Sequence, residues 1–373
     1  MTRLSIDKLT ELRLLLEVEG IGPGKFRNLL AKFRTTDKIL SADCISLTQT
    51  EGISTNLAKR IRGISSRYNE FRDLVELEQE KLAKLNASIV TVWDDVYPSV
   101  LKKIYDPPII LYTMGNHSEN DIYSIAIVGT RQPSNYGRVQ AERLTSELVN
   151  EGITIVSGMA RGIDSIAHTR ALKDNGRTVA IIGSGLDVVY PPENKKLFGE
   201  IAEKGLIISE YPLGTKPDAQ NFPKRNRIIS GLSLGTIVIE TGIKGGAMQT
   251  ASFALDQGKE VFSVPGNLGV RQSEGTNLII QKGEAKLIRC AEDVLVELEL
   301  KLKPILGKNI PKKVEGLNFF EEKIIGTITT EPLQIDKIAG LVEMNTSECL
   351  VHLLSLEFKG LVRQLPGKMF AAI

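Results

Sequence analysis

Apolar residues in the first 80 positions recur at intervals of three and four, as in the stretches 12–16 and 26–33. This spacing places apolar side chains on one face of a helix. Short turns that contain glycine, at 18–24 and 50–54, separate the helical stretches. The pattern therefore predicts a small all-α domain at residues 1–80, of the helix-hairpin-helix or SAM-like kind.

From residue 81 to residue 300 the pattern changes to short β-rich runs that alternate with amphipathic stretches. Such alternation is typical of a parallel sheet whose strands are joined by helical crossovers. We therefore predict an α/β domain at 81–300, with a Rossmann-like parallel sheet and helices on both of its faces. The predicted strands are Ile125–Val128, Thr154–Ser157, Thr178–Ile182, Leu206–Ser209, Thr236–Glu240 and Val261–Val264.

Residues 301–316 combine lysines, prolines and a glycine without periodicity, which predicts an interdomain linker. The remaining residues, 317–373, carry three helical stretches followed by two short β-rich runs, the order found in winged-helix domains. The third helical stretch, 345–358, contains no lysine or arginine, so we do not expect it to read a DNA groove. The other predicted elements are helices at 318–326 and 333–339 and strands at 361–364 and 369–373.

Glycines follow four of the predicted strands, and three of these four loops also carry a cation. Because parallel strands all end at one edge of a sheet, these loops should form a common rim, and we expect each loop to lead into a helix. A helix N-terminus attracts anions, and glycines let a phosphate approach the backbone. The rim is therefore a candidate phosphate-binding site, although a single loop of this kind is more often an ordinary turn. Its residues are Gly129 and Arg131, Gly158 and Arg161, Gly183, and Lys244 with Gly245 and Gly246.

The densest cluster of cations lies in the stretch 221–230, NFPKRNRIIS. Asn221 can cap a helix that has Pro223 in its first turn, which places Lys224, Arg225 and Arg227 near the helix start. Lys224 and Arg227 are three residues apart and should share a face, while Phe222 offers a ring on which an unstacked base could lie. The alternative interpretation is a solvated basic face beside a core phenylalanine.

Composition limits the function classes that need to be considered. The 47 basic and 45 acidic residues give a net charge of +2, so affinity for a polyanion must come from local placement of charge. Three widely separated cysteines form no metal-binding motif, and no apolar run is long enough to span a bilayer. We expect a cytoplasmic protein with no metal and no membrane anchor.

Several enzyme signatures are incomplete in this sequence. A dinucleotide fingerprint starting at Gly183 would need a third glycine where Val188 stands, and Gly258-Lys259 is followed by Glu260 rather than by the Ser or Thr of a phosphate-binding loop. His168 lies inside a predicted helix with no recognisable nucleophile beside it, so we expect a structural role. The expectation is a protein without a cofactor and without catalytic activity.

Several motifs in a fixed order resemble the DprA/Smf family in its three-domain form. The motifs are IVGTRQ at 127–132, SGMARGID at 157–164, GSGLDVVYPPEN at 183–194, NFPKRNRIISGLS at 221–233 and GGAMQTA at 245–251. The sequence departs from the family pattern at Lys244-Gly245-Gly246-Ala247, where a serine-rich turn is usual, and at Gly283-Glu284-Ala285, which has an extra glutamate.

This resemblance implies binding of single-stranded DNA, protection of incoming DNA during natural transformation, and loading of the RecA recombinase. It also implies a homodimer formed through the Rossmann-like domain. The DNA-binding residues carried over by motif are Arg131, Arg161, Phe222, Lys224, Arg225, Asn226, Arg227 and Lys244.

Two other hypotheses stay open. The first is a nucleotide-binding or nucleotide-hydrolysing enzyme of the phosphoribohydrolase type, since that fold also has a glycine-rich loop before a helix. Its loop carries a glutamate, whereas residues 242–251 here contain no acid. The second is an interaction scaffold whose rim binds a small nucleotide as a signal.

Overall fold

A computed structural model describes residues 5–302, 319–329, 332–358, 361–365 and 369–372. The chain divides into two compact units, Met1–Pro304 and Ile305–Ile373, which are described separately below. Of the predicted linker, 301–316, only the first two residues are described, as the end of a helix, and the rest lies outside the described residues.

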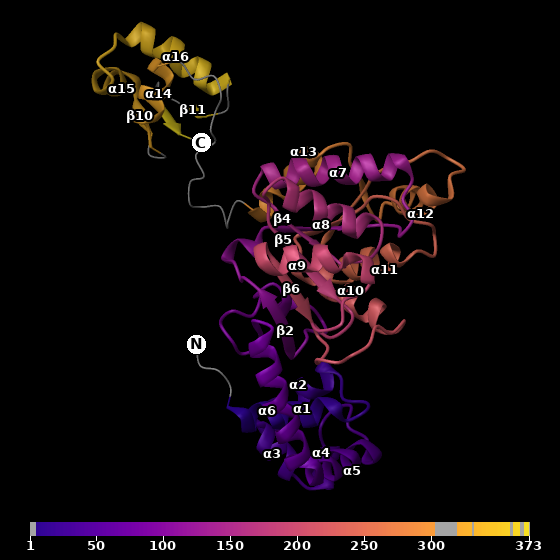
Figure 1. The fold of residues 1–373 in the computed structure, drawn as a ribbon. Coiled ribbons are helices and arrows are strands. Elements are labelled where there is room, and N and C mark those ends of the chain that lie inside the picture. Colours follow the sequence, from indigo (N-terminus) through magenta and orange to yellow (C-terminus); the bar gives the residue numbers. More distant parts are fainter. Residues whose placement is uncertain (1–4, 303–318, 330–331, 359–360, 366–368, 373) are drawn as a thin grey trace. The chain divides into compact units, whose positions relative to one another are not determined.

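The N-terminal part of the first unit is entirely helical, as its apolar spacing predicts (Figure 1). Its helices bury leucines and phenylalanines in a core that continues into residues of the sheet, such as Ile110 and Tyr112. The helical region and the sheet are therefore joined by a shared core. The helices are α1 (Ile6–Glu17), α2 (Pro23–Phe33), α3 (Thr36–Ser41), α4 (Cys44–Thr48), α5 (Thr55–Ile64) and α6 (Tyr68–Lys84).

A nine-stranded sheet follows within the same unit, in the order β1-β2-β6-β5-β4-β3-β7-β8-β9. The neighbours from β6 to β9 pair in parallel, whereas β1 and β2 pair antiparallel at one edge. The strand order reverses between β3 and β7. The strands are β1 (Ala87–Thr91), β2 (Ile110–Gly115), β3 (Ser124–Val128), β4 (Thr154–Ser157), β5 (Thr178–Ile182), β6 (Leu206–Ser209), β7 (Gly235–Val238), β8 (Glu260–Ser263) and β9 (Lys286–Leu287).

Helices cover both faces of the sheet, so the predicted fold class is confirmed. The helices α7, α8 and α9 pack beside one another on one face, and α10 packs against α11 on the other (Figure 1). The strands from β3 to β7 are buried on both faces, which explains their continuous apolar character. The helices are α7 (Asn135–Asn150), α8 (Ile163–Lys173), α9 (Lys195–Lys204), α10 (Asn221–Leu232), α11 (Gly246–Asp256), α12 (Arg271–Gln281) and α13 (Ala291–Leu302).

The second unit has the winged-helix order of elements, and its strands pair in the order β10-β12-β11. Ile338, Leu353 and Phe370 lie in its own apolar core. The predicted second helix begins two residues later than expected, because Leu333 and Gln334 form a short strand. The elements are α14 (Phe319–Ile325), β10 (Leu333–Gln334), α15 (Ile335–Leu341), α16 (Thr346–Phe358), β11 (Val362–Leu365) and β12 (Met369–Ala372).

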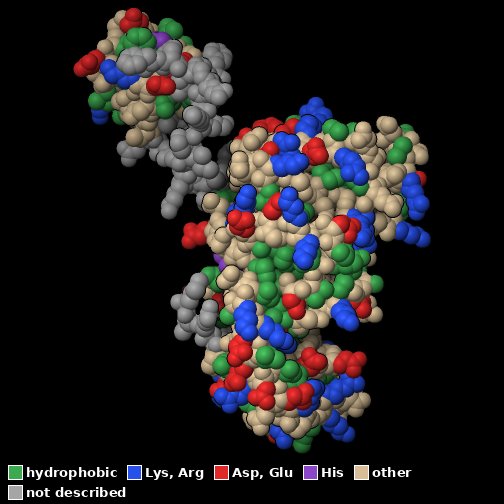
Figure 2. Space-filling view, in the orientation of Figure 1, with side chains coloured by type: hydrophobic (Ala, Val, Ile, Leu, Met, Phe, Trp, Pro, Cys, Tyr) green, Lys and Arg blue, Asp and Glu red, His purple; other side chains and the backbone are tan. Residues whose placement is uncertain are grey.

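The surface charge follows the balanced composition. Figure 2 shows basic and acidic side chains interspersed over the helical region on the face in view. Among the described residues, none of the helices combines the length and the apolar character that crossing a bilayer requires.

A buried carboxylate joins the helical region to the sheet. Glu78 of α6 accepts hydrogen bonds from Arg13 of α1 and from the Tyr112 hydroxyl of β2, the latter at 3.3 Å. Its other oxygen accepts the backbone N–H of Leu213 at 3.1 Å. The side chains of Glu78 and Arg13 are only 10% and 18% exposed. Removing one member would leave the other charge buried without its partner.

We expect Glu78→Ala to lower the free energy of unfolding by about 3 kcal/mol, because it leaves the guanidinium of Arg13 buried without its charged partner. Glu76→Ala is the matched control on the same helix, since Glu76 forms an exposed pair with Arg72, and it should cost less than about 1 kcal/mol. Urea unfolding followed by circular dichroism measures both. Equal effects of the two changes would contradict the assigned role of Glu78.

Candidate functional site

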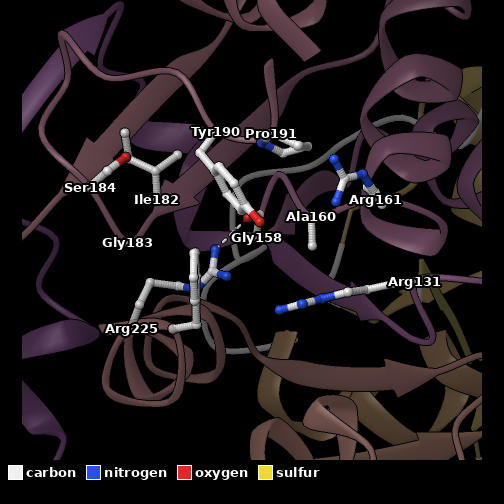
Figure 3. A pocket seen from close by; sticks show the side chains of 11 residues that line it. Arg131, Gly158, Ala160, Arg161, Ile182, Gly183, Ser184, Tyr190, Pro191 and Arg225 are labelled. Carbon is white, nitrogen blue, oxygen red and sulfur yellow. Dashed lines mark hydrogen bonds between the residues drawn. The ribbon is translucent and has the colours of Figure 1, made fainter. Parts of the chain in front are cut away.

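A groove of about 840 Å³ lies at the carboxyl edge of the parallel strands. It is lined by the loops that follow β3 and β7 and by the start of α10. The strand order reverses between β3 and β7, and open α/β sheets bind ligands in the crevice at such a reversal. Beside the groove is a smaller slot lined by the loops that follow β4 and β5 (Figure 3).

An exposed cation and two aromatic rings line both the groove and the slot. The guanidinium of Arg131 lies over the ring of Phe222, 5.8 Å from the ring centroid. The ring of Tyr190 lies 5.6 Å from that of Phe222, and both rings are half-buried. Figure 3 shows the Arg131 side chain pointing into the slot below Ala160. The groove therefore offers a cation beside aromatic faces that remain partly open.

The Phe222 ring needs the glycine at the end of β5. A Cβ atom at Gly183 would lie 3.1 Å from Cδ1 of Phe222, closer than ordinary packing contacts. The loop after Gly183 does not lead directly into a helix, contrary to our expectation, because α9 begins only at Lys195. Gly183 serves the site by leaving room for a ring.

Arg225 is buried within the wall of the groove, with 5% of its surface exposed. Its Nη1 donates hydrogen bonds to the carbonyl oxygens of Gly158 and Ile181, at the ends of β4 and β5. Burial lowers the pKa of Arg225 to about 10. A Cβ atom at Gly158 would lie 2.4 Å from that same nitrogen, so only glycine fits there. The charge of Arg225 is thus directed at the backbone.

Asp164, at the start of α8, lies beside Arg225 below the same loop. It accepts the backbone N–H groups of Gly158 at 3.1 Å and of Ala160 at 3.4 Å. Burial raises its pKa to about 6, while the nearby positive charge of Arg225 acts in the opposite direction. Asp164 and Arg225 together fix the loop that carries Arg161.

Arg227, which we expected to share a helix face with Lys224, is also buried. Arg227 is 8% exposed, and its guanidinium pairs with Glu210 at 2.6 Å and with Asp106 at 3.3 Å. Lys224 is exposed at the first turn of the same helix. Two carboxylates therefore neutralise Arg227 inside the fold, and Lys224 alone of the two faces solvent.

The start of α10 differs from the sequence prediction in its cap. The helix begins at Asn221, so Gln220 holds the cap position instead, and its side chain makes no capping hydrogen bond. Asn226, which is 9% exposed, donates to the carbonyl oxygen of Gly246 at 3.5 Å and links α10 to α11. The predicted Asn226 thus lies at the junction of the two helices that border the groove.

The loop after β7 completes the rim. Lys244 and Gly246 are exposed there, and Gly245 caps α11 without a side-chain hydrogen bond. The hydroxyl of Thr241 is buried and donates to the carbonyl oxygen of Gly242 at 3.1 Å. Gly129 packs against Ile163 and the backbone of Glu240, behind the rim.

The structure thus brings the predicted residues to one edge but gives them different environments. Arg131, Arg161, Lys224 and Lys244 are exposed, whereas Arg225 and Arg227 are internal. Sequence reasoning missed Tyr190, Asp164 and Glu210 as site residues, although the first two lie within the quoted motifs. Whether any of these residues contacts a ligand stays a prediction. The fold and the groove define a Rossmann-like protein with a cation-lined rim.

Three family models match successive parts of the chain. Residues 88–299 match DNA recombination-mediator protein A, residues 317–368 match the DprA winged helix domain, and residues 12–63 match the SAM-like helix-hairpin-helix tandem. The first match alone covers more than half of the chain. The chain belongs to the DNA recombination-mediator protein A family, and the resemblance to DprA/Smf is confirmed.

Individual relatives agree with this assignment. Protein Smf of Synechocystis is 34% identical over 388 residues, which cover 95% of this chain and 96% of that protein. The crystal structure of DprA from Streptococcus pneumoniae matches with a TM-score of 0.65 and 32% identity, over 79% of this chain and 99% of that one. A Helicobacter pylori DprA structure, which concerns the single-stranded DNA binding mode of that protein, matches with a TM-score of 0.52 and 33% identity over 58% and 97% of the two chains.

His168 of α8 lies behind the site and is completely buried, with Nδ1 2.7 Å from the Thr178 hydroxyl. Burial, together with the charge of Arg225, lowers its pKa from 6.5 to about 3. Below pH 6.5 the His168 imidazole is protonated in the unfolded chain but stays neutral in the folded chain. This difference makes the folded protein less stable as the pH falls.

We expect His168→Gln to reduce the loss of stability between pH 7 and pH 5 by about 2 kcal/mol. Asp164, whose pKa is raised to about 6, acts in the opposite direction over this range, but it is present in both proteins and cancels in the comparison. Urea unfolding at both pH values measures the difference. Identical pH dependence would show that His168 titrates normally in the folded protein.

Proposed function

We propose that the groove binds single-stranded DNA. The observation that carries the proposal is the cation-lined rim around the partly open rings of Phe222 and Tyr190. Proteins that bind single strands combine a basic groove for the backbone with aromatic faces for unstacked bases. Bases in a duplex are already stacked on one another, so they cannot stack on these rings. The subject of the Helicobacter pylori structure supports the same class of ligand.

The geometry supports different roles for the predicted DNA-binding residues. Arg131, Lys224 and Lys244 are exposed, and we assign them to phosphate contacts. Phe222 is assigned to base stacking. The internal Arg225 and Arg227 hold the loops and α10 in place. We therefore assign them an indirect role, in which they position the exposed residues that contact DNA.

The wider role is carried by the family alone. DNA processing, protection of incoming DNA in natural transformation, loading of RecA and a homodimer through the Rossmann-like domain are proposals that rest on the resemblance and on the names of relatives such as the Streptococcus pneumoniae DNA processing protein DprA. The winged-helix domain at 317–373 and the helical domain at 1–80 are proposed as accessory domains.

The hydrolase alternative needs a carboxylate that is free to act at the groove. Asp164 accepts two backbone N–H groups, and Glu240 is 2% exposed and accepts the Ser134 backbone N–H at 2.8 Å. Both carboxylates therefore serve the fold. Release of free base from a nucleoside monophosphate by the purified protein would favour the hydrolase instead.

We expect Lys224→Ala to make the dependence of log affinity on log salt concentration shallower by about one unit, because one phosphate contact is lost. Lys173→Ala is the matched control: Lys173 is an exposed lysine at the C-terminal end of α8, away from the loop edge. Fluorescence anisotropy with labelled oligo-dT across a salt series measures both variants. A slope unchanged in Lys224→Ala would remove that residue from the interface.

We expect Phe222→Ala to weaken binding of oligo-dT by about tenfold without changing the salt dependence, since a stacked base contributes about 1–3 kcal/mol. Phe222→Tyr keeps the aromatic face and should bind within about twofold of the wild type, by the same stacking argument. Matched duplex DNA and a mononucleotide complete the comparison. Equal affinity for single-stranded and duplex DNA would overturn the proposed function, and tighter binding of the mononucleotide would favour the nucleotide-binding scaffold.

A further inference from the structure

An exposed carboxylate at the rim contacts a predicted DNA-binding cation. Arg161, in the loop after β4, forms a two-pronged ion pair with Glu193 of the 3-10 helix η4 (Pro192–Asn194). Nη2 donates to Oε2 at 3.1 Å, and Nε donates to Oε1. The two side chains are 50% and 51% exposed, so both reach solvent at the edge of the slot.

Buried hydrogen bonds hold the backbone segments that carry Arg161 and Glu193 next to each other. Asn194, the residue after Glu193, is 9% exposed and donates to the Met159 carbonyl oxygen at 2.9 Å and to the Ser165 hydroxyl at 2.8 Å. These bonds tie η4 to the loop that carries Arg161. Glu193 is therefore positioned by buried contacts of its neighbour.

The pair distinguishes Arg161 from the other exposed cations of the rim. Within the part of the chain that the structure describes, Arg131, Lys224 and Lys244 form no ion pair. Carboxylates and phosphates can both accept two parallel N–H···O hydrogen bonds from one guanidinium. The hydrogen bonds with Arg161 lower the pKa of Glu193, so the carboxylate is charged at neutral pH.

We infer that Glu193 competes with DNA phosphate for Arg161 and thereby sets the affinity of the groove below its maximum. This inference rests on the proposed single-strand binding. A phosphate that reaches Arg161 must displace the carboxylate, and an exposed pair of this kind is weak enough to be exchanged. Glu193 is thus an affinity-determining residue that itself makes no contact with DNA.

The first test is Glu193→Gln, measured by anisotropy with labelled oligo-dT across a salt series. We expect binding at low salt to tighten about two- to fivefold, because the competing charge is gone. The salt dependence should become steeper, by about one unit at most, because Arg161 then contacts phosphate in every complex and no longer exchanges between phosphate and Glu193. Glu200→Gln is the matched control: it removes the same charge from α9, where Glu200 pairs with Lys196.

The second test places Glu193→Gln in an Arg161→Ala background. The inference requires that the tightening disappear there, since no guanidinium remains to be released. Tightening that persists without Arg161, or that is matched by Glu200→Gln, would show a general charge effect and overturn the inference, as would no change in Glu193→Gln alone. Failure of the wild type to bind oligo-dT would instead overturn the proposed function, before any variant is compared.

Discussion

The site depends on one buried guanidinium. Arg225 reaches from α10 to the carbonyl oxygens of Gly158 and Ile181, and it joins the ends of two neighbouring strands to the helix on one face of the sheet. A buried charge is costly unless it is hydrogen-bonded, so this arrangement depends on the two carbonyl oxygens that accept from Nη1. It also requires a glycine at 158, because a Cβ atom there would overlap the guanidinium. The loop with Arg161 and the start of α10 are therefore held in fixed positions relative to each other. The exposed side chains that they carry are positioned by the same contact.

The cations of the stretch 221–230 have different structural roles. Lys224 faces solvent, Arg225 binds backbone, and Arg227 is neutralised by Glu210 and Asp106. The internal arginines hold in place the helix that presents Phe222 to the groove and carries the exposed Lys224. An interface of this design keeps its phosphate-binding charge on a few exposed side chains and devotes the others to preorganisation.

The sequence predicted the strands β3 to β8 well, because each is a short apolar run that ends at glycine or polar residues, but it missed the two-residue parallel strand β9. It did not predict β1 and β2, whose antiparallel pairing joins segments about 20 residues apart and depends on contacts that no local pattern records. The rim was predicted from strand ends alone. The burial of Arg227 was not, since Asp106 lies 121 residues away in the sequence. Glu193 was overlooked because its partner Arg161 comes from a different loop. Local spacing locates a site, whereas tertiary contacts decide which of its charges are free.

The central claim is that single-stranded DNA lies along this rim with a base against Phe222. Photo-cross-linking of an oligo-dT that carries 5-iodouracil, followed by mass spectrometry of the peptides, tests it most directly. The account predicts cross-links to the peptides that contain Phe222 and Tyr190. Cross-links confined to the winged-helix unit or to the helices α1–α6 would contradict it and move the DNA to another surface.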